Sequence, residues 1–549
     1  MELLHQRGFN VSFICDGKAV PPNGARPRGI SQFARNHVDM KLRHQIAQRS
    51  DIDLHRACDG FEAEACAVDL LDQHHPFGVL QVVDFGQPGP ARDKDEPGVT
   101  RVVHQQDARQ CPIRDMGGVC GKTLMQLKRI HRHSSFVGII TRARALRGIR
   151  LRIGIIGCGI AGQAAAIALA RDGHDVTVFE RFAEAKPVGA GLLLQPSGQL
   201  ALERLGILDR VKQRGAPVKR LYGRTTGGRT IMDLRYVKFD KQAQGLGLHR
   251  AVLFQALQDG LAASGAKLVL GFDVTKIKDV NAPRVIARDG RAEGPFDLVV
   301  NCAGTHDNLR KSLNVRVDDP VYPWGCLWAI LPDRTGAFQE ELRQVCESTQ
   351  IMIGILPIGR VPDGAHDGNH VALFWSLLHK QYGAQRKIGI DALRSRILHY
   401  WPEAKPVVDQ LHDINQFSLA TYRDVRMKTW REGHVLVIGD AAHGTSPQLG
   451  QGANLALIDA ITLASALRQK RDVESALIAY ERMRRPHLRY YQWASHRVTP
   501  MFQSNSRVLG WLRDIFFGPM AKTPGIARIM RNTLAGVRKS PMGLWKAPD

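Results

Sequence analysis

The pattern of apolar and polar residues changes at about residue 150. The segment Leu151–Ile156 is a short apolar run, which is typical of a strand buried in a parallel sheet. The alanine- and leucine-rich segment 164–171 predicts a helix, and Gly173 is placed as its C-terminal stop. A second strand is predicted over 175–179. Strand, helix and strand in this order predict a βαβ unit and an α/β fold.

Later segments indicate a second sheet and a helical tail. Two more buried strands are predicted over 296–300 and 434–438, and the chain from Val473 onward has a mostly helical pattern. Four other stretches alternate partly between apolar and polar positions, as strands with one buried face do: 218–224, 322–331, 351–358 and 370–377. We therefore expect an α/β domain with an inserted α+β domain built on a β-sheet, followed by C-terminal helices.

A glycine pattern, Gly157-x-Gly159-x-x-Gly162, lies between the first predicted strand and helix. In this context Gly157 allows a tight turn, Gly159 lets the backbone approach a pyrophosphate, and Gly162 lets helix and strand pack closely. Free N–H groups at the start of the helix would hold the pyrophosphate. Glu180 ends the second strand, where it would bind ribose hydroxyls. The pattern predicts a Rossmann-like dinucleotide site and does not distinguish FAD from NAD.

The predicted elements define a discontinuous first domain. The expected ranges are 151–216, 245–318 and 426–475 for the Rossmann-like domain, 217–244 and 319–425 for the β-sheet domain that binds substrate, and 476–549 for a basic helical region. Residues 1–148 show no sustained periodicity and are expected to be an irregular extension. One hypothesis is a start codon assigned too early, with the natural start at residue 151. The alternatives are a genuine, poorly ordered extension and, less favoured because its Cys and His spacings fit no ligand template, a metal-binding domain.

A second, longer motif follows the predicted strand 434–438. It runs from Gly439 to Ala460 and leads into a helix. Asp440, at the end of a strand, is placed to bind ribityl or ribose hydroxyls. The glycines before the helix expose N–H donors, and the helix N-terminus stabilises negative charge on a reduced flavin. His443 is interpreted as a structural residue of this loop.

On these residues, the chain from about Leu151 to Arg497 resembles the single-component flavin-dependent aromatic hydroxylases, the para-hydroxybenzoate hydroxylase-like class. Its motifs are most similar to the salicylate-hydroxylase and ubiquinone-biosynthesis-hydroxylase branches. The resemblance implies FAD as cofactor, with Pro447 beside the flavin ring and Gly450–Asn454 at its pyrimidine edge. It also implies that Arg250 lies near the flavin, together with a loop matched by Gly189–Leu192 and Gln195–Ser197. The residues that we expect at the cofactor are Gly157, Gly159, Ile160, Ala161, Gly162, Glu180, Arg181, Gly191, Arg250, Gly304, Arg310, Gly439, Asp440, Pro447, Gly450, Gln451, Gly452, Ala453 and Asn454.

The chain departs from the family at one position. The family carries a Gly-Ala-Asp-Gly segment followed by an Arg, and here Gly304 and Arg310 align with it while Ala303 replaces the acid. In the family this acid helps to organise FAD and nicotinamide binding. Its loss puts efficient reduction by NADPH in doubt.

The resemblance implies a monooxygenase that uses NAD(P)H and O2 to hydroxylate an aromatic, phenolic substrate through a flavin C4a-hydroperoxide. The expected catalytic and substrate residues are Arg250, Pro447, Tyr222, Arg224 and His249, with Trp324 as a further candidate. The alternatives are an FAD-dependent dehydrogenase or reductase of the same fold, and a flavin-fold binding protein without catalysis.

Charge and composition limit the partners. The net charge is +24, from 76 Lys and Arg against 52 Asp and Glu, yet no zinc-finger or RNA-binding signature accompanies it, so we expect no nucleic acid partner. The nine cysteines include no C-x-x-C pair, so no metal site is expected and a reducing cytoplasm fits. An apolar stripe from Phe502 to Phe516 is interpreted as a helix packed on the catalytic domain, or as a weak peripheral membrane contact. We expect a monomer or homodimer.

Overall fold

The computed structural model describes residues 150–186, 191–362 and 368–548, together with four short strands nearer the N-terminus. The chain divides into two compact units, Met1–Val137 and Gly138–Asp549. In the first unit the described strands form an antiparallel sheet in the order β2-β1-β3-β4: β1 (Phe13–Cys15), β2 (Lys18–Val20), β3 (Cys66–Val68) and β4 (Gln81–Val83). The remainder of the expected irregular extension, up to residue 148, lies outside the described residues.

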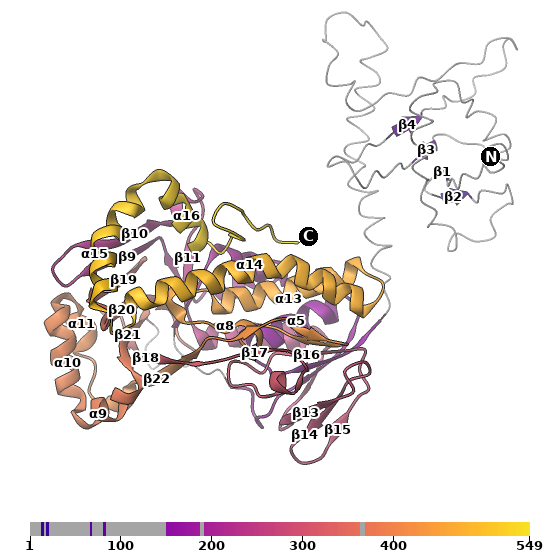
Figure 1. Cartoon of the computed structure of the whole chain (residues 1–549), viewed down its shortest axis with the longest axis horizontal. Helices are drawn as coiled ribbons and strands as arrows, with labels where there is room; N and C mark the ends of the chain where they lie inside the picture. Colours follow the sequence, from indigo (N-terminus) through magenta and orange to yellow (C-terminus); the bar gives the residue numbers. More distant parts are fainter. Residues whose placement is uncertain are drawn as a thin grey trace, which may run out of the picture. The chain divides into compact units, whose positions relative to one another are not determined.

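The second unit contains a six-stranded sheet, of which β16 is labelled below the helices α5 and α8 in Figure 1. Its order is β12-β6-β5-β16-β25-β24, and all pairs are parallel except the edge pair β24 and β25. Its strands are β5 (Arg152–Ile156), β6 (Asp175–Phe179), β12 (Lys267–Val269), β16 (Leu298–Asn301), β24 (Arg431–Glu432) and β25 (Val435–Val437). Each of the four buried strands predicted for the first domain overlaps one of these. The predicted α/β class is confirmed.

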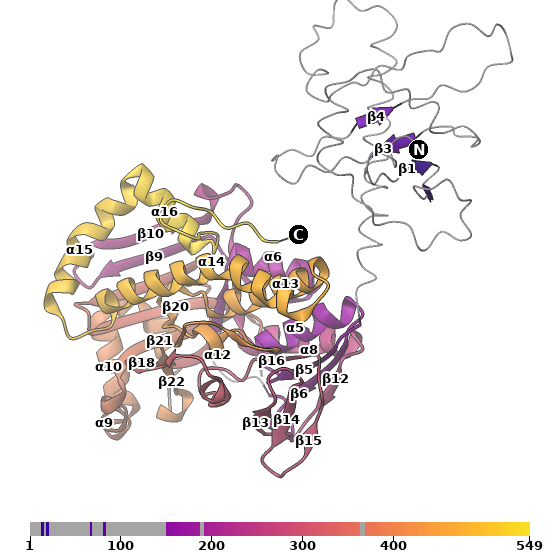
Figure 2. The same cartoon turned by 45° about the vertical axis from the view of Figure 1, so that its right-hand side comes forward.

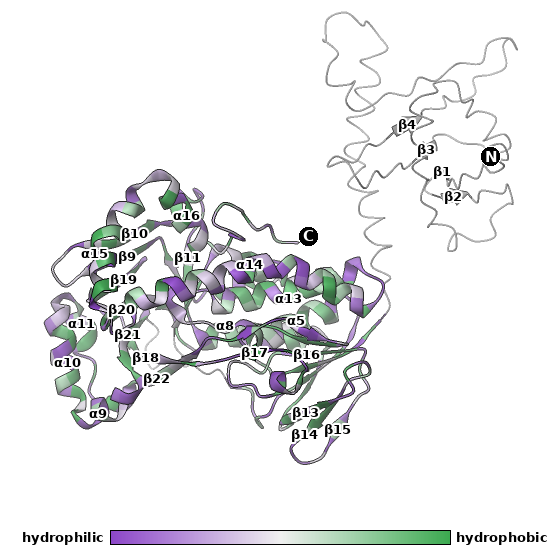
Figure 3. Ribbon diagram, in the orientation of Figure 1, coloured by the Kyte–Doolittle hydropathy of each residue, from purple (hydrophilic) through white to green (hydrophobic). Residues whose placement is uncertain are grey.

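Helices cover this sheet and bury its apolar faces. They are α5 (Ile160–Arg171), α6 (Pro196–Arg204), α7 (Leu208–Lys212), α8 (Arg250–Ala263), α13 (Gly452–Gln469) and α14 (Val473–Phe502). Helix α13 packs against α5, α6 and α14. Figure 3 shows α13 largely hydrophobic and α14 of mixed character, because α13 lies inside the unit while α14 has one face in solvent.

A seven-stranded sheet lies beside the first, in the order β10-β9-β19-β20-β21-β18-β22 (Figure 2). Its strands are β9 (Arg220–Thr225), β10 (Thr230–Arg235), β18 (Val321–Pro332), β19 (Glu341–Glu347), β20 (Ile351–Gly359), β21 (His370–Leu378) and β22 (Ser418–Arg423). Only β9 and β19 pair in parallel. One face packs against the helices α9 (Tyr382–Lys387), α10 (Gly389–Tyr400) and α11 (Lys405–Val408) around a buried cluster that includes Val345, Trp375 and Leu393. We call this the helix-covered face.

The opposite face of the seven-stranded sheet looks toward the rest of the unit. There it packs against a three-stranded sheet of β7 (Gly191–Leu194), β11 (Gly245–His249) and β8 (Ala216–Val218), in a cluster that joins Leu193 and Val218 to Leu356 and Ala372. We call this the inner face. Two small sheets complete the unit: β13 (Val274–Lys278), β14 (Arg284–Ala287) and β15 (Ala292–Glu293), and the pair β17 (Val317–Asp318) and β23 (Arg426–Met427).

The C-terminal helices α15 (Arg507–Lys522) and α16 (Pro524–Leu534) pack on β10 at the edge of the seven-stranded sheet. The apolar stripe from Phe502 to Phe516 is only partly buried, because helix α15 turns some of its apolar residues toward solvent. It buries Gly510 and Arg513, and it leaves Val508 and Trp511 with 65% and 61% of their surface exposed. The guanidinium of Arg513 is bound by Asp514 and the Met501 carbonyl. Among the described residues, no helix is both long and apolar enough to cross a bilayer.

A buried ionic cluster joins α13, α14 and the chain after α16. Asp459 on α13 accepts a hydrogen bond of 2.9 Å from the Gly439 N–H, lies 2.6 Å from His443 Nε2 and accepts one of 2.7 Å from Arg484 Nε. Arg484 also binds His487, whose other ring nitrogen lies 2.9 Å from the Gly536 carbonyl oxygen. The Trp545 ring stacks on His487.

The charges within this cluster favour a single ionisation state. Burial opposes ionisation of Asp459, but its interactions with His443 and Arg484 outweigh burial and hold its pKa below the usual range. Burial, together with the Arg484 charge, lowers the pKa of His487 well below its ordinary value, so this ring is neutral and can accept from Arg484. The cluster therefore contains one compensated buried charge pair with its hydrogen bonds satisfied.

We predict that Asp459→Asn destabilises the protein strongly, because it leaves the fully buried Arg484 without a counter-charge. Removing one partner of a buried ion pair costs on the order of 3–5 kcal/mol. Thermal unfolding followed by circular dichroism would measure this as a lower Tm. The control is Asp172→Asn, which breaks the more exposed ion pair with Arg468 and should lower the Tm much less. Equal losses of stability in the two variants would contradict the prediction.

Candidate active site

The carboxyl ends of four parallel strands bring the sequence motifs together at one edge of the six-stranded sheet. Gly157 follows β5, Glu180 follows β6, Cys302 follows β16 and Gly439 lies two residues after β25. Backbone hydrogen bonds continue the ladder into these turns: the Gly157 N–H donates to the Phe179 carbonyl oxygen at 2.8 Å. In open α/β sheets, ligands bind in the crevice outside this edge.

The three glycines of the first motif have different surroundings. Gly157 has φ +96°, and a Cβ there would lie 2.8 Å from the Cys302 carbonyl oxygen. A Cβ on Gly162 would lie 1.9 Å from the Gly157 carbonyl oxygen, so this glycine is needed for the close contact of helix and turn. Gly159 has no neighbouring heavy atom within 4 Å of its Cβ position. This open space lies at the N-terminus of α5, where a phosphate would sit.

Glu180 is fixed at the rim of this turn. Its carboxylate accepts hydrogen bonds from the Cys158 N–H at 2.9 Å and from the Phe182 N–H at 3.1 Å. These contacts hold it next to the glycine turn, in the place expected for a ribose ligand. Arg181 is exposed, with its guanidinium over the Phe182 ring. Ile160 and Ala161 are buried in the first turn of α5.

The second motif lies directly against the first. Gly439 has φ +63°, and a Cβ there would be 2.9 Å from the Ala161 Cβ of α5. The next residue, Asp440, begins α12 (Asp440–His443), and its Oδ1 lies 3.6 Å from the Cβ position of Gly452, the first residue of α13. Because Gly439 and Gly452 have no side chains, the Asp440 carboxylate and the N-terminus of α13 can lie at the same sheet edge as Gly159.

The loop 447–452 crosses from α12 to α13, and its glycine Gly450 has a left-handed φ of +60°. Pro447 is exposed. Gln451 is buried and donates to the Leu534 carbonyl oxygen at 2.8 Å, so the end of α16 supports the loop. Asn454 is also buried: it accepts from the Gln195 N–H at 2.9 Å and donates to the carbonyls of Leu193 and Gly450. The Asn454 side chain thus positions the loop, and its predicted contact with a cofactor stays a prediction.

Three buried polar atoms around this loop have no hydrogen-bond partner. They are Gln195 Nε2, Ser197 Oγ and Gln451 Oε1. Gln195 Nε2 lies 3.7 Å from the Cβ position of Gly450, and its Oε1 accepts from Tyr236 at 2.6 Å, which fixes the orientation of the amide. Buried polar atoms without partners are rare in native proteins, and water or a ligand usually completes their hydrogen bonds.

Strand β7 pairs with β11 so that Gly191 lies opposite His249. Arg250 follows His249 and is therefore close to Gly191 as well. His249 caps α8, accepting from the Ala251 N–H at 3.3 Å, and burial together with His370 lowers its pKa. Arg250 is half-buried, and no hydrogen bond or ion pair of its side chain is found among the described residues. Its guanidinium is therefore available to a ligand.

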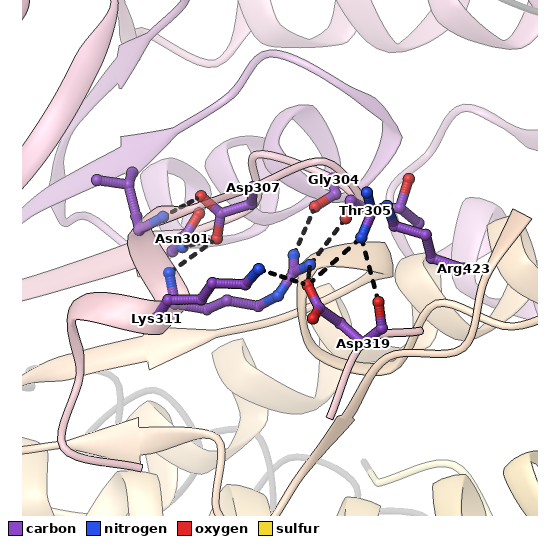
Figure 4. Close-up of polar contacts among 9 residues, drawn as sticks. Asn301, Gly304, Thr305, Asp307, Lys311, Asp319 and Arg423 are labelled. Atoms are coloured by element: carbon purple, nitrogen blue, oxygen red, sulfur yellow. Dashed lines mark hydrogen bonds and ion pairs between the residues drawn. The ribbon is translucent and has the colours of Figure 1, made fainter. Parts of the chain in front are cut away.

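The position of the missing family acid is exposed. Ala303 lies beside the first turn, since its Cα is 3.2 Å from the Cβ position of Gly157. The nearby acid Asp307 cannot replace it, because both of its oxygens are used within the loop (Figure 4). Asp307 Oδ1 accepts from the Leu309 N–H at 2.7 Å, while Oδ2 accepts from the Asn301 side chain at 2.6 Å and the Arg310 N–H at 3.1 Å.

Arg310 also serves this loop. Its buried guanidinium donates to the Thr305 carbonyl oxygen at 2.8 Å, to the Gly304 carbonyl oxygen at 3.3 Å and to Asp319 at 2.7 Å. Gly304 has φ +84° and open space at its Cβ position. Arg310 therefore positions Gly304, and its own predicted contact with the cofactor stays a prediction.

Two predicted substrate residues are not brought to this edge. Tyr222 and Arg224 lie on the helix-covered face of the seven-stranded sheet, where Arg224 binds Glu403 at 2.9 Å. Their neighbours Leu221 and Gly223 occupy the inner face, because side chains alternate along a strand. Trp324 does lie on the inner face, and is buried. Trp328, which the sequence indicates as packing of this sheet, lies on the same face. The inner-face aromatic residues Phe374 and Tyr422 were not predicted from the sequence, although alternation along the strands was an available signal.

The residues present fit a flavin dinucleotide. The space at Gly159 and the α5 N-terminus suit a pyrophosphate, Glu180 a ribose, and Asp440 with the α13 N-terminus the ribityl and ring end. The unpartnered Gln195 Nε2 lies at the same end, 3.7 Å from the Cβ position of Gly450.

Comparisons with known proteins give the same assignment. The family described as FAD binding domain matches residues 150–491. A probable 2-heptyl-3-hydroxy-4(1H)-quinolone synthase from Rhodococcus erythropolis is 26% identical over 68% of this chain and 92% of its own length. An FAD-dependent urate hydroxylase from Klebsiella pneumoniae is 27% identical over 60% of this chain and 85% of its own.

The fold is also found in solved structures. The crystal structure of Klebsiella pneumoniae HpxO with FAD and uric acid matches 70% of this chain and 97% of its own, with a TM-score of 0.59 and 22% identity. At this identity the likeness shows the fold. The predictions of an FAD cofactor and of a flavin-dependent aromatic monooxygenase are confirmed, and the chain belongs to the FAD binding domain family.

Proposed function

We propose that the chain uses NAD(P)H and O2 to hydroxylate an aromatic small molecule. The observation that carries the proposal is a close approach at Gly191, where a Cβ would lie 2.7 Å from both the Ala372 Cβ and the Ile358 Cγ2. This approach supports joining the ring end of the nucleotide site to the inner face of the seven-stranded sheet. On that face Phe374 is two residues from Ala372 on β21, and Trp328 of β18 is paired with Phe374. An aromatic substrate on that face would lie next to the flavin ring.

When bound, FAD would accept a hydride and activate O2, and the chemistry of oxygen transfer belongs to the cofactor. The residues of the chain bind and orient. Free N–H groups at the start of α13, at Gly452 and Ala453, together with the helix dipole, stabilise negative charge at the ring end. Arg250 is available to pair with a negative group of the cofactor, and Pro447 would lie beside the ring, where it offers no N–H donor.

The similar proteins support an aromatic or heteroaromatic substrate. One is named for a quinolone and another for urate, and both names describe planar rings. The aromatic side chains of the inner face can stack on such a ring.

Three further features stay proposals. A cytoplasmic location is supported by the need for reduced nicotinamide coenzyme. The proposed oligomeric state is a monomer or homodimer. A weak peripheral membrane contact is supported by the exposed Val508, Trp511 and Phe516 of α15 beside basic Arg507 and Lys522. Sedimentation with anionic vesicles, which Trp511→Asp should weaken, tests this contact.

The proposed reaction is tested by the purified holoprotein. We expect bound yellow flavin, and oxidation of NADH or NADPH that an aromatic substrate accelerates, with uptake of O2 and a product heavier by one oxygen atom. Coenzyme oxidation without an oxygenated product from any ring tested would favour the dehydrogenase alternative. Absence of flavin after reconstitution would favour a binding protein.

Gly159 and Gly162 give a matched pair for cofactor binding. Gly159→Val should keep the fold but abolish FAD binding, because the added side chain fills only the space of the pyrophosphate. Gly162→Val should prevent folding, because its Cβ would lie 1.9 Å from a carbonyl oxygen. Circular dichroism reports the fold and flavin absorbance reports binding. A yellow Gly159→Val protein with FAD, or wild-type protein that releases FMN, would contradict the assignment.

Ala303→Asp should accelerate reduction of the flavin by NAD(P)H. The family acid helps to arrange flavin and nicotinamide, and Ala303 is exposed beside the glycine turn with no other free acid in its loop. A gain of about 1.4 kcal/mol in transition-state stabilisation would appear as a tenfold faster rate. Anaerobic stopped-flow absorbance isolates this step, and Ala303→Asn is the neutral control. Equal rates in the Asp and Asn variants would show that the negative charge has no role.

A further inference from the structure

The seven-stranded sheet separates charged and neutral side chains between its two faces. The charged residues within its strands are Arg220, Arg224, Asp233, Arg235, Glu341, Arg343, Glu347 and Arg423. The pairing of the strands places all of them on the helix-covered face or its margin. The inner face carries none of them.

The register shows this directly. In the parallel pair of β9 and β19, Arg224 is opposite Val345, which is buried in the cluster under α10 and α11. Tyr222 is opposite Arg343 in the same pair and opposite Asp233 in the pair of β9 and β10. Because side chains of directly paired residues lie on the same face, these charges all face away from the nucleotide site.

The inner face is aromatic and neutral. On β18 it presents Trp324, Cys326 and Trp328, and their partners across the strands include Phe374 and Ser376. Trp328 and Phe374 are partly exposed. The Phe374 ring lies over Gly354, where a Cβ would be 1.9 Å from the ring, so the absence of a side chain at Gly354 leaves the ring flat on the sheet.

The polar groups on this face are also uncharged. The Tyr422 hydroxyl donates to Cys326 Sγ at 2.9 Å, and burial raises the pKa of this thiol to about 11, so both groups keep their protons at neutral pH. Ser376 is bound by the backbone of Met352 and Gln350. A further ionisable group, the His370 imidazole, lies at the end of β21 near His249.

Among the described residues of the elements that cover the inner face, Arg250 after β11 carries a charge without a partner, and the proposed function assigns this charge to the cofactor. The other contacts to the face are neutral. The end of α14 closes it with Phe502, which packs with Cys346 and Met352. Behind Phe502, the guanidinium of Arg513 lies 5.2 Å from the ring but is neutralised by Asp514. Gln503 binds the Gly325 carbonyl oxygen and Gln448, so the link from α14 to the flavin loop is neutral as well.

We infer that the substrate is a neutral aromatic molecule without a carboxylate or other formal charge on the ring that enters the site. The inference rests on the proposed function for its site. Stacking on Trp328 and Phe374 would hold such a ring, and the Tyr422 hydroxyl could accept a hydrogen bond from it. A carboxylate at the same place would lose its hydration, and with Arg250 assigned to the cofactor the inner face offers no cation to replace it, which is strongly unfavourable.

The test compares two probes on the wild-type holoprotein by titration calorimetry at pH 7.5, in the absence of NAD(P)H. The probes are 2-naphthol and 6-hydroxy-2-naphthoate, which share one ring system and differ in the carboxylate. We expect 2-naphthol to bind at least about tenfold more tightly, a difference of about 1.4 kcal/mol. A naphthoate that binds as tightly, or a 2-naphthol that does not bind, overturns the inference.

A pair of variants locates the effect on the inner face. Trp328→Arg should shift the ratio of the two Kd values at least tenfold in favour of the naphthoate. Thr421→Arg adds the same charge to the other face of β22, where Thr421 is exposed, and should leave the ratio unchanged. The same shift in both variants overturns the inference, and if Trp328→Arg does not fold, the wild-type comparison decides.

The binding result is separable from the proposed reaction. Tighter binding of 2-naphthol without formation of an oxygenated product from any ring would leave the inference standing and contradict the proposed function. Tighter binding of the naphthoate with its hydroxylation would do the reverse.

Discussion

The carboxylate of Asp459 is the constraint on which the flavin-binding end of the structure depends. It lies on α13 and holds three other elements: the turn at Gly439, His443 of α12 and Arg484 of α14. A buried carboxylate is tolerable only with such partners, and the same partners fix where α13 begins relative to β25. Through His487 and Gly536, the chain after α16 is joined to the same cluster. The last part of the sequence is therefore part of the support of the nucleotide site.

Glycines at close contacts, together with the ionic cluster, position the parts of the nucleotide site. Gly439 against Ala161, and Gly162 against the Gly157 carbonyl, bring two motifs that are far apart in the chain to one sheet edge. Gly191 against Ala372 brings the seven-stranded sheet to the same place. At each of these positions a Cβ would overlap a neighbouring atom, whereas Gly159 meets open space. Three glycines are thus required by packing and the fourth by the ligand.

The two faces of the seven-stranded sheet differ in role: the helix-covered face stabilises the fold, and the inner face is the proposed substrate surface. The helix-covered face combines a buried apolar cluster with ion pairs at its margin, such as that of Arg220 with Asp233. The inner face carries aromatic and neutral polar groups and meets the ring end of the nucleotide site. Because alternation along a strand is strict, a shift of one residue in register would exchange these roles. The register of β9, β18 and β21 therefore controls which residues a substrate meets.

The sequence by itself determined the α/β class, the four central strands of the parallel sheet and the glycine motifs of a dinucleotide site, while the choice of FAD came from the family resemblance. These depend on local patterns: apolar runs, glycine spacing and acids at strand ends. The sequence did not indicate β7 and β11 or the small sheet of β13 to β15, because these strands are short and glycine-containing or half-exposed. It also placed Tyr222 and Arg224 near the substrate, whereas pairing with β19 turns both toward α10 and α11. The partners of Asp459, Asn454 and Asp307 and the face of each strand were decided by the tertiary structure alone, since hydrogen bonds and strand register join residues that are distant in the chain and have no local signature.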